Sequence, residues 1–272
     1  MTNVTKKDEL GAMNNTLLDP QQLANVNGPL HRDYASHFFR WSFIGRLIKR
    51  GIKILDVGAG TGSLAETLYR NKLAPELYVA VEIHKPFITK LLELKQKVNF
   101  PIDIFVTDVR NPNWHVEIHP KNYDIVTCFE VVEHFEKQHI QSMLSGMANL
   151  VKSSGVVLLS TPNYDGVHHA DNHIHEYTEQ ELIFELVSSF HILAEYGTFM
   201  SLGTPSKAKE ILSENDYNLF AKLHEYYNSS VLSILFAPAY PQESRNIMYV
   251  LSPKKSTNEG IVRVWPPQEL IE

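Results

Sequence analysis

Short apolar runs alternate along this chain with longer segments in which apolar residues recur every three or four positions. Each short run has the length and composition of a buried strand. Strands are expected over 52–57, 76–81, 102–106, 123–129 and 155–160, and helices over 31–49, 64–70, 86–97, 137–151 and 179–190. Strands that alternate with helices predict a doubly wound α/β fold, with a mostly parallel sheet covered on both faces.

The last third of the chain departs from this alternation. Two more strands are expected over 191–196 and 246–251, and about 50 residues separate them, too many for a tight turn. Helical spacing over 206–227 then predicts an inserted helical lid over about 200–245 that covers a substrate. The boundaries that follow are a flexible arm over 1–30, a single domain over 31–252 and a tail over 253–272.

The composition is that of one globular domain. With 272 residues, 43% of them hydrophobic, the chain can bury one sizeable core. The net charge of −6 does not require a nucleic-acid-binding face, but it does not exclude a local basic patch. The single cysteine, Cys128, excludes a disulfide framework. Because no signal peptide or membrane span is apparent, we expect a cytoplasmic protein, and its oligomeric state is left open.

A glycine-rich loop follows the first expected strand. The strand ends at Asp56, and the residues after it are Val-Gly-Ala-Gly-Thr-Gly, up to Gly62. No Gly-Lys-Ser/Thr follows, which disfavours a triphosphate cradle, and Asp56 would repel a pyrophosphate. The loop suits a nucleotide-like ligand that carries a positive centre and an amino group. The residues expected to contact it are Asp56, Gly58, Ala59, Gly60, Thr61 and Gly62.

Two further acids end the second and third expected strands. Glu82 follows the glycine loop by about 20 residues, where a carboxylate accepts hydrogen bonds from both hydroxyls of a ribose. Asp108, or a backbone group beside it, is placed to receive an adenine amino group. The alternative is that such acids only cap helices or face water. The neighbouring residues included in the expected site are Ile83, Val109 and Phe129.

The segment Asp-Val-Gly-Ala-Gly-Thr-Gly over 56–62 resembles the first motif of class I S-adenosylmethionine-dependent methyltransferases. The resemblance implies S-adenosyl-L-methionine as the cofactor and a Rossmann-like methyltransferase domain over 31–252. It also implies a sheet whose last strand is reversed, because the late pair of strands resembles the final hairpin of that fold.

A second group of polar residues follows the fourth and fifth strands. Glu130, Glu133 and His134 have the spacing of one helical turn, and if they form one, they project to the same face. Downstream, the segment 160–178 contains four histidines: His168, His169, His173 and His175. Because the two segments follow neighbouring strands, carboxylates and imidazoles can face one another beside the cofactor. Mixed oxygen and nitrogen ligands of this kind suit a divalent ion.

Glu-x-x-Glu-His followed by a later histidine resembles two methyltransferase families. These are the 3′-terminal 2′-O-methyltransferases of small RNAs and the O-methyltransferases of ubiquinone synthesis. The resemblance implies a metal (Mg, Mn or Zn) held by Glu130, Glu133, His134 and either His173 or His175. His173-Ile-His-Glu-Tyr-Thr is similar to the H-x-F-E-W-T of the RNA enzymes, which favours His173.

This chain departs from the RNA enzymes at two positions of that segment, with Tyr177 for Trp and His175 for Phe, and it lacks evident basic RNA-clamping regions. Sugar and glycan methyltransferases also carry such segments, some without a metal. Two alternatives therefore stand beside a metal site: proton transfer or substrate binding by the same residues, and purely structural roles.

The function that these patterns favour is methyl transfer to a hydroxyl oxygen of a small molecule or sugar. No Asp/Asn-Pro-Pro-Tyr/Phe follows the fourth strand, which disfavours the amino-methyltransferases that carry this signature. One alternative is an RNA or DNA methyltransferase that acts on a 2′-oxygen or a base. The other is a catalytically inactive cofactor-binding subunit of an assembly. The expected catalytic residues are Glu130, Glu133, His134, His173 and His175.

Overall fold

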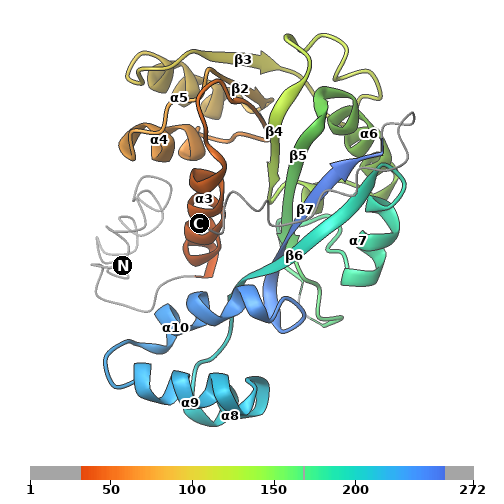
Figure 1. The fold of residues 1–272 in the computed structure, drawn as a ribbon. Coiled ribbons are helices and arrows are strands. Elements are labelled where there is room, and N and C mark those ends of the chain that lie inside the picture. The colour runs from red at the N-terminus through yellow and green to blue at the C-terminus, as the bar shows by residue number, and fades with distance from the viewer. Residues whose placement is uncertain (1–31, 168, 255–272) are drawn as a thin grey trace, which may run out of the picture.

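A computed structural model describes residues 32–167 and 169–254. The predicted arm over 1–30 and nearly all of the predicted tail lie outside the described residues. The described chain forms a seven-stranded sheet in the order β3-β2-β1-β4-β5-β7-β6 (Figure 1). The strands are β1 (Lys53–Val57), β2 (Leu77–Glu82), β3 (Ile102–Val106), β4 (Tyr123–Phe129), β5 (Val151–Pro162), β6 (Phe190–Met200) and β7 (Ser244–Pro253).

The sheet is parallel from β3 to β5, and β7 runs antiparallel to both of its neighbours, β5 and β6. This confirms the predicted doubly wound fold with a reversed last strand. Within the parallel part, Val57 pairs with both Val81 and Cys128. The carboxyl ends of β1, β2 and β4 therefore meet at one edge of the sheet, where ligands of such folds bind.

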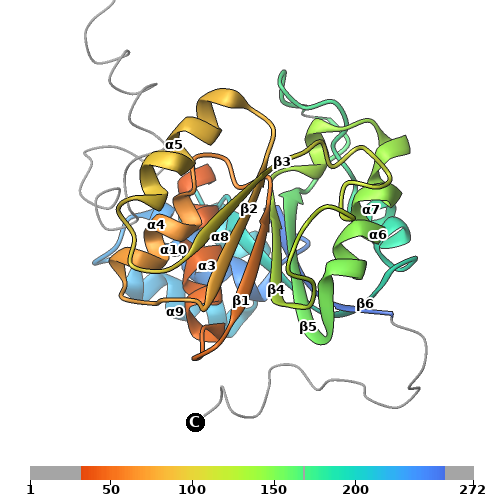
Figure 2. The same ribbon diagram turned by 90° about the horizontal axis from the view of Figure 1, so that it is seen from above.

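Helices cover both faces of the sheet, as Figure 2 shows from above. One face is covered by α3 (Arg32–Leu47), α4 (Ser63–Arg70) and α5 (Lys85–Lys95), and the other by α6 (Ile140–Leu150) and α7 (Glu179–Leu186). Alternate residues of β1 enter the two cores: Ile54 packs with Ile44 of α3, and Leu55 packs with Leu144 of α6. None of the described helices has the length and apolar character to span a membrane.

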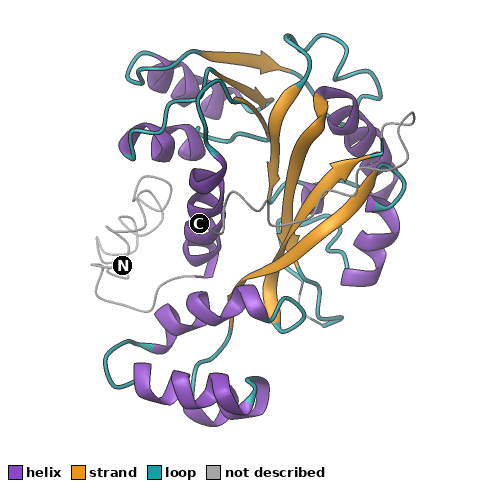
Figure 3. Ribbon diagram, in the orientation of Figure 1, coloured by secondary structure: helices purple, strands orange, loops and turns teal. Residues whose placement is uncertain are grey.

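The insertion between β6 and β7 forms three α-helices in the lower part of Figure 3, of which α10 contacts β6. They are α8 (Pro205–Ile211), α9 (Glu214–Leu223) and α10 (Ser229–Phe236). The continuous helix expected over 206–227 is broken because Ser213 caps α9, its hydroxyl accepting a hydrogen bond from the Asp216 amide. Asn228 caps α10 in the same way, and no helix was expected there. A separate small core around Phe220 and Leu232 joins the three helices.

Candidate active site

The glycine loop after β1 is shaped by left-handed backbone. Gly58 and Gly60 have φ of 71° and 56°, which non-glycine residues rarely adopt. A Cβ at Gly58 would also lie 2.4 Å from Cγ2 of Val131. At Gly60, by contrast, a Cβ would have no atom within 4 Å, so this part of the loop faces open space. The loop thus presents bare backbone to a ligand.

Glu82, at the end of β2, is held by backbone amides. Its Oε2 accepts a hydrogen bond from the Gly60 amide at 2.8 Å, and its Oε1 accepts from the amides of Ile83 and His84 at 2.7 and 2.9 Å. The side chain is therefore fixed between the glycine loop and the start of α5. A carboxylate has about four acceptor positions, so one is left for a ligand hydroxyl.

A cavity of about 790 Å³ opens beside this loop. Its far wall is formed by Asp108, Val109, Arg110 and Phe135. Arg110 makes a two-pronged ion pair with Asp108, whose shorter contact is 2.6 Å, and its guanidinium lies 5.9 Å from the centre of the Phe135 ring. The hydrogen bonds from Arg110 lower the pKa of Asp108 below its ordinary value. The volume and the mixed polar and apolar lining suit a nucleoside-sized cofactor.

Glu133, His134 and His173 form a cluster beside this cavity. One potential ligand atom from each lies within 4.8 Å of the other two. Each residue has its other polar atom engaged: Glu133 Oε2 accepts from Thr161 at 3.1 Å, His134 Nδ1 donates to the Asn172 carbonyl at 3.1 Å, and His173 Nδ1 donates to Glu176 at 2.5 Å. Nε2 of each histidine is therefore the ring atom that a neutral imidazole would offer to a metal or a proton. Such outer partners orient metal-ligating residues in proteins.

The Glu133 carboxylate gives the strongest indication that this cluster fits a cation. Its side chain is fully buried, and Oε1 has no hydrogen-bond partner among the described residues. Burial, helped by the nearby charge of Glu130, raises the pKa of Glu133 well above its ordinary value. A buried, half-satisfied carboxylate is costly unless a cation or proton balances it. One carboxylate and two imidazoles therefore fit a divalent metal.

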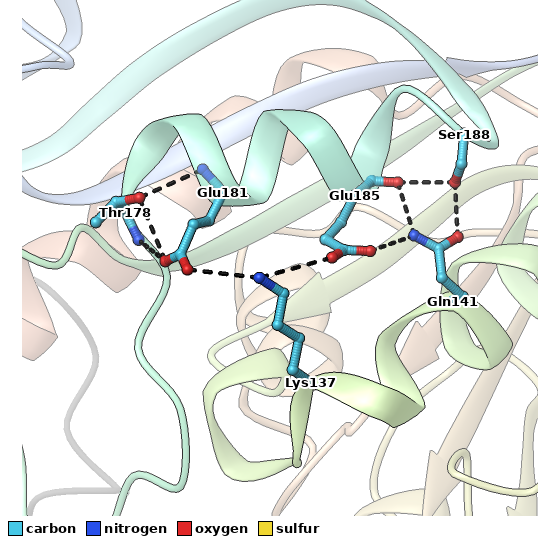
Figure 4. A network of polar contacts seen from close by, with 6 residues as sticks. All are labelled: Lys137, Gln141, Thr178, Glu181, Glu185 and Ser188. Atoms are coloured by element: carbon cyan, nitrogen blue, oxygen red, sulfur yellow. Dashed lines mark hydrogen bonds and ion pairs between the residues drawn. The ribbon is translucent and has the colours of Figure 1, made fainter.

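The loop that carries His173 is fastened at both ends. Near the cluster, the amides of Ile174 and His175 donate to the carbonyl oxygen of Glu133 at 2.8 and 3.1 Å. At its far end, Thr178 and Glu181 form a capping box that begins α7. Figure 4 shows how Lys137 joins this capping box to Glu185, which Gln141 of α6 also contacts. Packing of α7 against α6 therefore sets the position of His173.

A second cavity of about 360 Å³ lies on the other side of the cluster. Glu130 and His134 line both cavities, so the two meet at these residues. The second cavity also receives Arg40 from α3 and Asn246 from β7. A cofactor in the first cavity and an acceptor in the second would consequently meet beside Glu133, His134 and His173.

A family model described as a methyltransferase domain matches residues 32–222 of the chain. The chain belongs to this methyltransferase family. Two curated relatives are ubiquinone biosynthesis O-methyltransferases. That of Klebsiella pneumoniae (strain 342) is 35% identical over 116 residues, 43% of this chain and 45% of the relative. That of Xanthomonas campestris pv. campestris (strain B100) is 28% identical over 169 residues, 58% and 61% of the two chains. The methyltransferase thus spans about half the length of these relatives.

Among solved structures, a SAM-dependent methyltransferase from Archaeoglobus fulgidus superposes with a TM-score of 0.52. The superposition covers 82% of this chain and 95% of the other, at 16% sequence identity. At that identity the likeness shows the shared fold alone. Family and fold together place this methyltransferase in the class I S-adenosylmethionine-dependent superfamily, as the glycine loop indicated.

Only some of the residues predicted to contact the cofactor line the first cavity of this methyltransferase. Gly58, Gly60, Glu82, Ile83, Asp108 and Val109 line it, whereas Asp56, Ala59, Thr61, Gly62 and Phe129 do not. Asp56 is buried, with one oxygen accepting from the Tyr78 hydroxyl and the other from Thr127 at 2.7 Å. Burial raises the pKa of Asp56 to about 6. It supports the loop from within the core, and Phe129 lies under the Arg40 guanidinium instead.

Glu130 and His175 do not join the cluster. The expected helical turn begins only at Val132, and Glu130 before it adopts a left-handed φ of 55°. Its carboxylate accepts hydrogen bonds from Arg40 at 2.5 Å, Ser160 at 2.9 Å and Asn246 at 2.8 Å. His175 lies edge-on to Tyr177, with 4.4 Å between the ring centres. Of the two candidate histidines, the structure therefore brings His173 to Glu133.

Three residues that line the second cavity were not predicted from the sequence: Arg40, Asn163 and Asn246. Arg40 is fully buried, although it lies in an amphipathic helix where an arginine is normally solvated. The signal available in the sequence was an arginine flanked by two aromatic residues, Phe39 and Trp41. No local pattern marks the two asparagines, because each enters the cavity from a strand end.

Proposed function

We propose that this methyltransferase transfers a methyl group from S-adenosylmethionine to a hydroxyl oxygen of a small molecule or sugar. The supporting observation is the junction of the two cavities at Glu130 and His134, beside the cluster of Glu133, His134 and His173. A hydroxyl in the second cavity would lie between the cofactor and two imidazoles. That arrangement meets the need of oxygen methylation, which must remove a proton from the acceptor.

The first cavity would hold the cofactor through the residues already described. The bare backbone at Gly60 allows close approach, and Glu82 has one acceptor position left for a ribose hydroxyl. Asp108 and Val109 line the same cavity, and we propose that the backbone at Val109 receives the adenine amino group, because Arg110 already occupies the Asp108 carboxylate. S-adenosylmethionine supplies the methyl group on a positively charged sulfur. Substrate positioning then decides the rate, because the oxygen must approach in line with the carbon–sulfur bond.

In the reaction, the carbon–sulfur bond breaks as the carbon–oxygen bond forms, and the hydroxyl proton is released. His134 and His173 each hold their own proton on Nδ1, where the Asn172 carbonyl and the Glu176 carboxylate accept it. Their Nε2 atoms are therefore ready either to accept the hydroxyl proton or to ligate a cation. A positioned general base contributes on the order of 10²–10⁴-fold to such a step.

Glu133, His134 and His173 would hold a divalent metal such as Mg, Mn or Zn. When bound, such an ion polarises an oxygen and makes it more acidic. Glu130 would stay outside this ligand set, since Arg40 already balances its charge at 2.5 Å. A single carboxylate leaves the site positively charged with the ion in place, which favours loss of the hydroxyl proton.

The alternatives have less support. The described lining of the second cavity contains two arginines and no lysine. Both of them, Arg40 and Arg245, pair with carboxylates. Phosphates of RNA or DNA would therefore find no unpaired partner there. An inactive cofactor-binding subunit would have no need for the unpartnered Glu133 oxygen or for two imidazoles held in one tautomer.

The test measures methyl transfer from labelled S-adenosylmethionine to a panel of small hydroxyl acceptors, with and without added Mn²⁺ after chelation. His134→Ala and His173→Ala should each lower turnover by at least about 100-fold, while affinity for S-adenosylhomocysteine changes little. His191→Ala, at an exposed position of β6, is the matched control. Full turnover by either cluster variant would contradict the proposal. Full turnover after chelation would remove the metal and leave proton transfer as the role of the histidines.

A further inference from the structure

The second cavity has a lining that is unusual in its polarity. Apart from Pro162 and Ala170, every residue that lines it has a polar or charged side chain. Most small-molecule pockets are predominantly apolar, with only a few polar groups. At about 360 Å³ the cavity is also near the lower end of ligand-binding pockets. It therefore accommodates one compact ring and has little apolar surface to offer.

Both guanidinium groups of this lining are already paired with carboxylates of the protein. Arg40 pairs with Glu130 at 2.5 Å and Arg245 pairs with Asp165 at 3.5 Å. Glu176 is engaged by His173, and Glu133 belongs to the cation cluster. A phosphate or carboxylate on the acceptor would have to break one of these pairs. The lining thus disfavours an acceptor that carries a negative charge.

Hydrogen-bonding capacity, in contrast, is left over. Asn163 donates to the Ser244 carbonyl at 3.2 Å and Asn246 donates to Glu130, but within the described part of the chain neither side-chain oxygen accepts a hydrogen bond. Nη2 of Arg40 has no acceptor among the same residues, and Nδ1 of His37 is buried without a partner. Free acceptors and free donors lie around one small space. Hydroxyl groups satisfy both kinds, because each donates one hydrogen bond and accepts others.

An alkyl chain in this cavity would have the opposite effect. It would remove water from Asn163, Asn246 and Arg40 and return no hydrogen bond to them. Each buried polar group left unsatisfied costs free energy comparable to a lost hydrogen bond. An aromatic diol that carries a long alkyl chain is therefore a poor occupant, although its hydroxyls would suit the cluster.

We infer that the acceptor is a polyhydroxylated unit of monosaccharide size without an anionic group, bound through Asn163, Asn246 and Arg40 with a hydroxyl directed toward the cluster. This inference rests on the proposed oxygen methylation and narrows its substrate class. Asn163 is a specificity-determining residue under this assignment. It lies outside the cluster and outside the cofactor cavity.

The experiment compares four probes with the full-length protein, labelled S-adenosylmethionine and Mn²⁺. The probes are methyl β-D-ribofuranoside, methyl α-D-glucopyranoside, 4-decylcatechol and a short RNA. One of the two glycosides should be methylated with a kcat/KM at least about 10-fold above that of the other two classes of probe. Asn163→Leu should lower kcat/KM on that glycoside by roughly 10-fold, because it removes a polar partner and keeps the volume. Asn215→Leu, at an exposed position of α9, should leave it unchanged.

Each other outcome has a distinct meaning. Methylation of 4-decylcatechol but of neither glycoside would overturn this inference and would still support oxygen methylation. Preferred methylation of the RNA would overturn it in favour of a nucleic-acid acceptor. Failure with every probe, in a protein that binds S-adenosylhomocysteine, would overturn both the inference and the proposed function. If thermal melting shows Asn163→Leu to be folded and its kcat/KM equals that of the wild type, the assignment of Asn163 fails.

Discussion

The two cavities of this methyltransferase are walled by different kinds of group. In the cofactor cavity, the Glu82 carboxylate is held entirely by backbone amides, and the glycine loop offers backbone alone. In the second cavity, side chains hold one another: Arg40 fixes Glu130, and Glu176 fixes His173. Most substitutions leave the backbone geometry unchanged, whereas any substitution within a side-chain network alters that network. The first cavity thus binds through backbone groups, whereas recognition in the second depends on the identity of its side chains.

The largest expected effect is on the cofactor side. Glu82→Ala leaves the amides of Gly60, Ile83 and His84 without their acceptor and removes the partner proposed for the ribose. We expect calorimetry to show affinity for S-adenosylhomocysteine reduced by roughly 10- to 150-fold, since the one hydrogen bond to this charged group contributes roughly 1.5–3 kcal/mol. Asn163→Leu, in the second cavity, should change it less than about threefold. Equal losses of S-adenosylhomocysteine affinity in the two variants would show that cofactor binding does not depend on the first cavity alone.

This contrast also explains what could be predicted from the sequence. Strand β1, the glycine loop and Glu82 follow one another within a short stretch of sequence, so the local pattern was sufficient to locate the first cavity. The mostly parallel sheet followed from the alternation of strands with helices. The reversed strand β7 was also predicted, but from a resemblance and not from its own residues.

Contacts between distant segments could not be predicted in this way. Asp56 turns into the core because Tyr78, on the neighbouring strand, donates to it. Glu130 leaves the cluster because Arg40, 90 positions earlier, and Asn246, 116 positions later, bind its carboxylate. The spacing of Glu130, Glu133 and His134 suggested one helical face, but the left-handed backbone at Glu130 breaks the turn. Sequence spacing shows neither the partner nor the backbone conformation.

The second prediction tests whether Asp56 is buried or faces the cofactor. Its pKa of about 6 in the folded protein lies above the ordinary 3.8, so the folded state binds the proton more tightly than the unfolded state. The corresponding stability is present below pH 4 and is lost as the pH rises to 6. At about 1.4 kcal/mol per pKa unit, the loss amounts to about 3 kcal/mol.

Asp56→Asn does not titrate, so its stability relative to the wild type should increase as the pH rises from 4.5 to 7.5. Urea unfolding at three pH values across this range measures the difference. Asp216→Asn is the control, because hydrogen bonds from Tyr240 and Ser213 lower the pKa of Asp216. The stability of this variant relative to the wild type should not rise over this pH range. A constant difference for Asp56→Asn would mean that Asp56 is solvated, as a cofactor contact would be.

A third prediction concerns the side chains that support the cluster. Glu176→Gln keeps the shape of the residue that accepts from His173 Nδ1 but weakens the charge-assisted hydrogen bond. We expect turnover, and Mn²⁺ affinity measured by titration, to fall by about 10- to 100-fold, the usual cost of losing an outer-shell partner. Affinity for S-adenosylhomocysteine should not change. Glu210→Gln, on an exposed face of α8, provides the control, and an effect of equal size there would point to a general loss of stability.

The smallest expected effect comes from the insertion, which we propose to act as a lid over the acceptor. Phe220 lies at the centre of a core confined to α8, α9 and α10 and their immediate neighbours. Phe220→Ala should therefore loosen this region while the sheet stays intact, and hydrogen exchange should accelerate over 205–236 but not over 53–57. Because a loosened lid positions the acceptor less often, KM for the acceptor should rise roughly threefold at unchanged cofactor affinity. An unchanged KM, together with faster exchange in the insertion, would mean that these helices do not cover the second cavity. The polar lining would then have to select its substrate without a lid, through Asn163, Asn246 and Arg40 alone.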